Sequence, residues 1–181
     1  MLILYGDVPL TQPDTLRRCL SQVDDDSLCL ITLNMEDPTG YGRILRDDMG
    51  KVCRIVEQKD ASMEELCITE VNTGILACPR SFLASVLPTL SNHNAQGEYY
   101  LTDVIELAVK QGLAVNSVQP QWRWEVDGVN DRMQLARLER IHQRPLSERL
   151  MRDGVSLRDS ARLDIRGQVE AGQDVRIDVN V

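Results

Sequence analysis

The sequence predicts an α/β fold with a mixed sheet and crossover helices, followed by a helical arm and the start of a repeat structure. As far as residue 129, short apolar segments alternate with amphipathic ones, which is typical of strands connected by helices. From Asn130 the apolar residues recur at helical spacing, and near the end of the chain they recur every six residues. The chain is therefore expected to divide into segments 1–129, 130–154 and 155–181.

The first expected elements are two strands and the helix between them. Residues 2–5 and 28–32 are continuous apolar runs, which indicate strands buried on both faces of a sheet. Residues 11–22 carry apolar side chains on one helical face, and either Thr11 or Asp14 can cap that helix. This strand–helix–strand order favours a parallel crossover.

A β-hairpin is expected next, because two short strand-like segments flank the turn sequence DDMG. Its strands are predicted at 43–46 and 51–57. The remaining elements expected in this segment are a short helix at 62–66, a strand at 70–78, a helix after Pro79 and a helix at 102–111.

The last two segments follow other patterns. Residues 130–154 form an amphipathic arm that we expect Pro145 to interrupt or kink, and its interleaved arginines and glutamates are typical of a solvated helix face. The aliphatic residues that follow lie six apart, a period typical of hexapeptide β-helix coils and of neither helices nor strands. They are Leu163, Val169, Val175 and Val181. One such coil cannot bury its own interior, so a longer stack is expected.

Composition excludes several classes of protein. A net charge of -8 argues against sequence-independent binding of nucleic acid, which needs a basic face. No apolar run approaches the roughly 18 residues of a membrane span, and the apolar start is too short for a signal peptide. The five cysteines include no CxxC pair, so we expect reduced packing residues in a cytoplasmic protein, and the two histidines cannot complete a zinc site with them.

Several short strings point to one family when they are taken together. They are LYGDVPL, DPTGYGRI, IVEQKDA, EVNTGIL, NAQGEYYLTD and EVDGVND. In order and spacing they resemble the bacterial bifunctional N-acetylglucosamine-1-phosphate uridyltransferase / glucosamine-1-phosphate N-acetyltransferase family. The resemblance runs from Leu2 to Val181 and implies part of a Rossmann-like nucleotidyltransferase sheet, a linking arm and the first coil of a left-handed β-helix.

The resemblance also implies a reaction. In this family UMP passes from UTP to N-acetylglucosamine 1-phosphate, pyrophosphate leaves and UDP-N-acetylglucosamine forms, while the parent enzyme also acetylates glucosamine 1-phosphate from acetyl-CoA. Nucleotidyl transfer requires positioning and charge neutralisation rather than a covalent nucleophile, so no catalytic nucleophile is expected. It also predicts a hard cation, Mg²⁺, held by few protein oxygens.

The resemblance assigns Mg²⁺ to Asp7 and Asn130. Asp7 follows a buried strand, the usual place for a ligand in an open α/β sheet, although an Asp there can also simply terminate the strand. Asn130 precedes an apolar-periodic run, so it is equally a natural helix N-cap, and that role would compete for the same side-chain oxygen.

Substrate contacts are implied for the residues that match the family motifs. They are Tyr5, Gly6, Asp7, Gly42, Glu57, Asn72, Tyr100, Thr102 and Asn130. Other interpretations stay open for some of them: Gly42 as a turn glycine, Tyr100 as a packing residue beside Tyr99, and Thr102 as a helix cap. Asn72 is the most telling, because an amide within an apolar strand demands partners.

The chain also departs from the family pattern. The family's glycine-rich loop, with an arginine and a lysine for the triphosphate, lies upstream of LYGDVPL, and its acetyltransferase coils lie downstream. We therefore expect no appreciable turnover from this polypeptide alone, while the parent is expected to be a homotrimer. Two alternatives remain: a pyrophosphorylase for another sugar 1-phosphate, and a non-catalytic assembly module.

Overall fold

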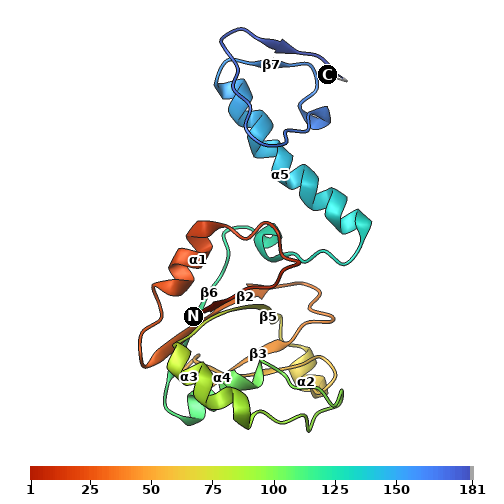
Figure 1. The fold of residues 1–181 in the computed structure, drawn as a ribbon. Coiled ribbons are helices and arrows are strands. Elements are labelled where there is room, and N and C mark those ends of the chain that lie inside the picture. The colour runs from red at the N-terminus through yellow and green to blue at the C-terminus, as the bar shows by residue number, and fades with distance from the viewer. Residues whose placement is uncertain (180–181) are drawn as a thin grey trace. The chain divides into compact units, whose positions relative to one another are not determined.

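The computed structural model describes residues 1–179 and contains two compact units, Met1–Asp127 and Gly128–Val181 (Figure 1). The first unit holds a six-stranded sheet in the order β4-β3-β5-β2-β6, with β1 paired to β5 off that path. The strands are β1 (Leu2–Ile3), β2 (Ser27–Asn34), β3 (Arg43–Arg46), β4 (Val52–Val56), β5 (Glu70–Ala77) and β6 (Ala114–Val118). Within the sheet β2 and β6 pair in parallel and the other pairs are antiparallel, so the predicted mixed sheet is confirmed.

The crossover at the start of the chain is present, with a shorter first strand than predicted. Because β1 and β2 are both antiparallel to β5, they are parallel to each other, and α1 (Pro13–Leu20) connects them. The expectation that residues 2–5 are buried on both faces is wrong: β1 ends at Ile3, and the next residues, Leu4 and Tyr5, are both 48% exposed. The reason is that β1 has a hydrogen-bonded neighbour, β5, on one side alone among the described residues.

The cap of α1 also differs from the prediction. The N-cap position is Gln12, without a side-chain cap bond, and Asp14 lies inside the first turn. The hydroxyl of Thr11 instead donates to the carbonyl oxygen of Glu125 at 3.0 Å, which joins the start of this helix to a distant segment.

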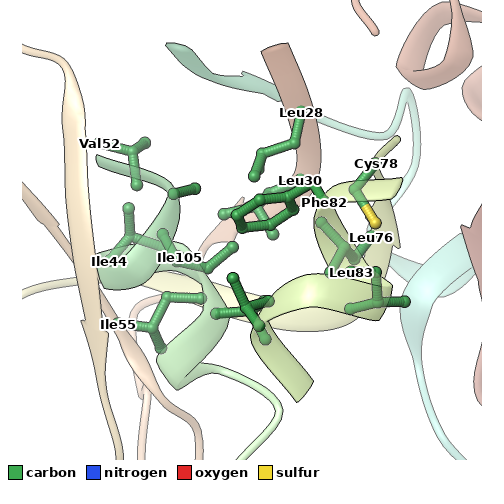
Figure 2. Packing of buried hydrophobic residues seen from close by; sticks show 13 residues of the cluster. Leu28, Leu30, Ile44, Val52, Ile55, Leu76, Cys78, Phe82, Leu83 and Ile105 are labelled. Atoms are coloured by element: carbon green, nitrogen blue, oxygen red, sulfur yellow. The ribbon is translucent and has the colours of Figure 1, made fainter. Parts of the chain in front are cut away.

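Two apolar clusters cover the two faces of the sheet. In β2, Leu28 and Leu30 belong to one cluster, while Cys29 and Ile31 belong to the other, as the alternation of a strand requires. The first cluster is packed by α3 (Arg80–Val86) and α4 (Asp103–Lys110), and Figure 2 shows Phe82 among its side chains. The second cluster is packed by α1 on the opposite face (Figure 1).

The predicted hairpin and short helix are confirmed. The strands β3 and β4 pair antiparallel across a turn in which Gly50 N donates to Asp47 O. The helix α2 (Met63–Leu66) begins with a reciprocal capping box between Ser62 and Glu65. The strand β6 is absent from the sequence prediction, because its Asn116 and Ser117 give a half-buried edge strand no clear apolar pattern.

The second unit consists of α5 (Arg132–Arg152) and the segment that follows it. The expected interruption at Pro145 is wrong, since one helix runs through it. Side chains on either side of the proline hold the helix: Gln143 exchanges hydrogen bonds with the backbone of Ile165, and the Ser147 hydroxyl donates to Ser160 O.

In the described part of the segment after α5, β7 (Ser156–Leu157) and β8 (Arg176–Ile177) pair in parallel. Pairing of strands one coil apart agrees with the predicted start of a β-helix, and its handedness stays a prediction. Val169 and Val175 are 47% and 37% exposed, so one coil does not bury them, and Val181 lies outside the described residues.

No helix among residues 1–179 has the length and apolar character needed to cross a membrane. All five cysteines are free, and Cys19, Cys29 and Cys78 are buried, as expected for packing residues. Cys53 is partly buried, and Cys67 is exposed, so the expectation is wrong for Cys67.

Candidate functional site

Strand pairing brings Gly42, Glu57 and Asn72 together. Arg43 at the start of β3 pairs with Val56 on one side and with Val71 on the other, so the residues adjoining these pairs lie side by side. The backbone N–H of Asn72 donates to Gly42 O at 2.9 Å. A Cβ on Gly42 would lie 3.3 Å from both carboxylate oxygens of Glu57 and 3.0 Å from Ile55. The absence of a side chain therefore keeps open the corner of the sheet where Gly42, Glu57 and Asn72 meet.

Thr102 completes this corner from the start of α4. Its hydroxyl donates to Glu57 Oε1 at 2.9 Å, and it makes no side-chain cap bond. Thr102 does occupy the N-cap position of α4, as the alternative expected, but its hydroxyl bonds to the carboxylate and does not cap the helix. Glu57 Oε2 accepts no hydrogen bond from the described residues and remains able to accept one from a ligand hydroxyl.

A small hollow of about 20 Å³ lies beside these residues. Polar atoms come from Tyr5, Asn72 and Thr102, and the other side chains that line it are aliphatic: Leu30, Ile55, Leu76, Leu101 and Ile105. Its size admits one water-sized or methyl-sized group. The arrangement therefore suits a ligand that places a small apolar group inside and polar groups at the rim.

Tyr5 brings the YGD motif to the same place. Burial raises the pKa of the Tyr5 phenol, and the negative charges of Glu57 and Asp7 raise it further. The carboxylates of Glu57 and Asp7 therefore both favour the neutral form of this phenol. Gly6 and Asp7 follow in an exposed turn, where the Asp7 carboxylate is accessible.

Tyr100 lies on a loop that contacts the segment after β4. Its hydroxyl accepts a hydrogen bond from Gln96 Nε2 at 2.8 Å, and Gln96 Oε1 accepts one from Lys59 Nζ at 2.7 Å. Loss of hydration raises the pKa of the Tyr100 phenol, which the bond from Gln96 partly offsets. The alternative of two packing tyrosines is wrong for Tyr99, which is 70% exposed.

Asn130 belongs to the second unit, so the structure leaves its pairing with Asp7 as a prediction. The N-cap of α5 is Asp131, whose Oδ1 accepts from Gln134 N at 2.7 Å, so the interpretation of Asn130 as the cap is wrong. The Asn130 side chain is exposed and makes no hydrogen bond within residues 1–179, which leaves its oxygen available. These residues contain no group of three or more His, Cys, Asp or Glu side chains able to hold a metal ion. An exposed carboxylate such as that of Asp7 nevertheless suits Mg²⁺, which keeps most of its ligands as water or phosphate.

Two residues beside this corner are missing from the sequence prediction. Arg43 is 2% exposed and uses its guanidinium to bind the Tyr41 carbonyl and Gln58 Oε1, while its Nε has no partner among the described residues. Gly74 is buried, has φ of +81° and lines the hollow. Arg43 lies in the string GYGR and Gly74 lies in NTGI, but the sequence alone does not show that either residue faces inward.

No family model matches the chain. Curated relatives do: a bifunctional protein GlmU from Alcanivorax borkumensis is 62% identical over 178 residues, which are 98% of this chain and 39% of that protein. Proteins of the same name from Azotobacter vinelandii and Ralstonia pickettii are 60% and 57% identical and match 100% and 99% of the chain, and 40% and 39% of their own length. The chain thus spans about 40% of the length of these relatives.

Among solved structures, a putative glucose-1-phosphate thymidylyltransferase from Bacillus anthracis matches with a TM-score of 0.47 and 16% identity. That match covers 76% of this chain and 49% of the other.

Proposed function

Because this chain belongs to the family of the bifunctional GlmU proteins, we propose that its first unit is the sugar-phosphate side of a uridyltransferase site. One observation carries the proposal: Gly42, Glu57, Asn72 and Thr102 meet at one corner of the sheet. These residues come from four separate segments, so their meeting is a property of the fold and not of one local motif. Tyr5, Gly6, Asp7 and Tyr100 adjoin that corner in the proposed site.

The proposed substrate is N-acetylglucosamine 1-phosphate. The hollow beside Asn72 has aliphatic walls and room for one methyl-sized group, which suits the methyl of an acetamido group. The free oxygen of Glu57 suits a sugar hydroxyl. A sugar phosphate without the acetamido group would leave the hollow unfilled, so the pocket supports an N-acetylhexosamine over a plain hexose.

In the proposed reaction a phosphate oxygen of the sugar attacks the α-phosphorus of UTP, and the bond to pyrophosphate breaks. The residues of this chain bind and orient the sugar, because displacement at phosphorus depends on in-line placement of the attacking oxygen. Asp7 and Asn130 would hold Mg²⁺, which when bound neutralises phosphate charge. No side chain of this chain is assigned a covalent role.

The proposed location is the cytoplasm, which the buried free thiols support, since reducing compartments preserve them. The proposed partners are UTP and N-acetylglucosamine 1-phosphate, and the proposal includes neither nucleic acid nor a membrane. In domain terms, residues 1–129 are the proposed nucleotidyltransferase part, 130–154 the arm and 155–181 the start of the hexapeptide repeat.

The test is calorimetric titration of the chain with three ligands in the presence of Mg²⁺: N-acetylglucosamine 1-phosphate, glucose 1-phosphate and inorganic phosphate. We expect millimolar or tighter affinity for the first, weaker binding of the second and the weakest binding of the third. Equal affinity for all three would reduce the site to a phosphate binder and contradict the proposal.

A second proposed role is assembly, and it concerns the second unit. Val169 and Val175 stay exposed there, and a hollow of about 960 Å³ lies between the end of α5 and residues 165–173. An open coil with exposed aliphatic residues needs neighbours. We propose that further coils fill this role and that the whole protein is a homotrimer. Sedimentation of the chain with and without Val169→Asp tests it: a trimer lost in the variant supports assembly through this coil, and a monomer in both contradicts it for this chain.

A further inference from the structure

The proposed site contains a glycine, Gly74, that is not among the site residues predicted from the sequence. Gly74 lies inside β5, at the point where the register between β2 and β5 shifts between the Leu30 and Thr32 pairings. Its φ of +81° is a conformation that favours glycine. A glycine inside a strand marks a bulge or a close approach by another group, and both are present here.

The close approach comes from Tyr5. The pairs Leu2↔Ala77 and Ile3↔Leu76 set the register of β1 on β5, and its continuation sets Tyr5 opposite Gly74. A Cβ on Gly74 would lie 2.1 Å from Cε2 of that ring and 2.4 Å from Cζ. The ring therefore occupies the volume that any other residue at position 74 would fill.

The backbone of Gly74 also fixes the amide of Asn72. The N–H of Gly74 donates to Asn72 Oδ1 at 3.1 Å. Because an N–H can donate to the oxygen alone, this bond determines which way the amide is turned. Asn72 Nδ2 makes no hydrogen bond within the described residues, so it remains the donor that a ligand meets.

We infer that Gly74 is a positioning residue for the sugar site, because it orients Asn72 as a donor and seats the Tyr5 ring. Tyr5, Asn72 and Gly74 all line the same hollow. The site is then complementary to a ligand that presents an acceptor, such as an acetamido carbonyl, to Asn72. This inference rests on the proposed function for the identity of the ligand, and on the strand register alone for the placement of the ring.

The first variant is Gly74→Ala, and its matched control is Gly112→Ala. Gly112 has a similar φ of +83°, but nothing lies within 4 Å of an added Cβ, so the control carries the backbone strain without the contact. The added methyl of Gly74→Ala displaces the half-exposed Tyr5 ring, which can move outward. We expect about a tenfold loss of affinity for N-acetylglucosamine 1-phosphate in Gly74→Ala and wild-type affinity in Gly112→Ala.

A readout without ligand separates this inference from the proposed function. The Tyr5 phenol is followed by NMR of ¹³C-labelled tyrosine, assigned with Tyr5→Phe. In the wild type the ring lies against the Gly74 backbone, so its displacement in Gly74→Ala shifts the Tyr5 ring signals and weakens their nuclear Overhauser contacts with residue 74, whereas Gly112→Ala leaves the ring signals unchanged. If the wild-type chain binds no sugar phosphate, the proposed function fails and these ring signals alone decide whether Gly74 seats the ring.

A further variant, Asn72→Asp, tests the donor without changing Gly74. Aspartate keeps an oxygen for the Gly74 N–H but replaces the donor by an acceptor, so we expect about a tenfold loss of affinity with the fold retained. Wild-type affinity in both Gly74→Ala and Asn72→Asp, together with unchanged Tyr5 ring signals in Gly74→Ala, would overturn the inference.

Discussion

At the scale of single residues, the Glu57 carboxylate is the best-defined polar group of the candidate site. One of its oxygens is held by the Thr102 hydroxyl, and the other accepts no bond from the described residues. A carboxylate with one oxygen fixed in this way presents the second in a defined direction. In the proposed site, this direction would let an acid at the end of an apolar strand accept a hydrogen bond from a ligand hydroxyl.

The substitution Glu57→Gln tests that group. Glutamine can still accept from Thr102, but it turns the second position into a donor and removes the charge. We expect about a tenfold loss of affinity for N-acetylglucosamine 1-phosphate with an unchanged unfolding midpoint, measured by calorimetry and circular dichroism. Glu64→Gln is the matched control, because Glu64 is exposed on α2. Equal affinity of both variants for N-acetylglucosamine 1-phosphate would contradict a role for Glu57 in binding.

At the scale of elements, an ion pair adds to the backbone pairing that joins the hairpin to the rest of the sheet. Arg46 Nε and Nη2 donate to the two oxygens of Glu70 at 2.7 Å each, and the Thr32 hydroxyl donates to the same carboxylate at 2.7 Å. These bonds join β3 to β5 and β2. The position of the hairpin matters for the proposed site because Gly42 and Glu57 lie at its two open ends.

This ion pair predicts a dependence of stability on pH. Burial raises the pKa of Glu70, but the bonds from Arg46 and Thr32 outweigh that effect and hold it below its usual value of 4.5. The stabilisation is therefore present above pH 4.5 and is lost as the pH falls through the lowered pKa. We expect Glu70→Gln to unfold with about 1–3 kcal/mol less free energy at neutral pH and with a flatter decline in acid.

The control for Glu70→Gln is Glu106→Gln, which breaks the exposed pair with Lys110. Exposed pairs of this kind contribute about 0.3–0.5 kcal/mol, so the control should remain close to the wild type at every pH. Parallel acid denaturation curves for the wild type and Glu70→Gln would contradict the role of the ion pair.

Helix α3 offers a test of the core that covers this face of the sheet. Leu83 is 5% exposed in the cluster of Figure 2, whereas Leu87, one turn later, is 44% exposed. We expect Leu83→Ala to lower the free energy of unfolding by about 2–5 kcal/mol and Leu87→Ala to lower it by less than about 1 kcal/mol. Denaturant unfolding measures the free energy of unfolding of both variants. Equal losses would contradict the position of Leu83 in this buried cluster.

The sequence predicts the elements of this chain better than it predicts the details of the site. Apolar runs and turn residues were enough to predict β2, the hairpin and α4, because burial dictates their composition. They overstate β1, which ends at Ile3 and is followed by the half-exposed residues Leu4 and Tyr5. They also miss Gly74, because its role depends on a register between residues far apart in the sequence.

Local capping rules predict the wrong partner for two threonine hydroxyls. Thr11 and Thr102 are good cap residues by type, but their hydroxyls donate to Glu125 and Glu57, which lie far away in sequence. The continuous helix through Pro145 has the same cause, since side-chain bonds to residues 160–165 outweigh the local break.

At the scale of the whole molecule, the net charge of -8 opposes the binding of an anionic sugar phosphate. A bound cation offsets this repulsion, so we expect the affinity for N-acetylglucosamine 1-phosphate to fall when Mg²⁺ is removed with EDTA. Asp7→Asn should reduce the gain from Mg²⁺ and leave the affinity without metal nearly unchanged or slightly higher. The same affinity with and without Mg²⁺ would contradict a metal-assisted site.

The central claim is that the corner formed by Gly42, Glu57, Asn72 and Thr102 binds the sugar phosphate. The most direct test is a map of backbone amide chemical shifts while N-acetylglucosamine 1-phosphate is added to the isotope-labelled chain with Mg²⁺. The claim predicts saturable shifts concentrated at Gly42, Asn72, Gly74 and Thr102. Shifts confined to other parts of the chain, or no saturable shifts at millimolar ligand, would contradict it.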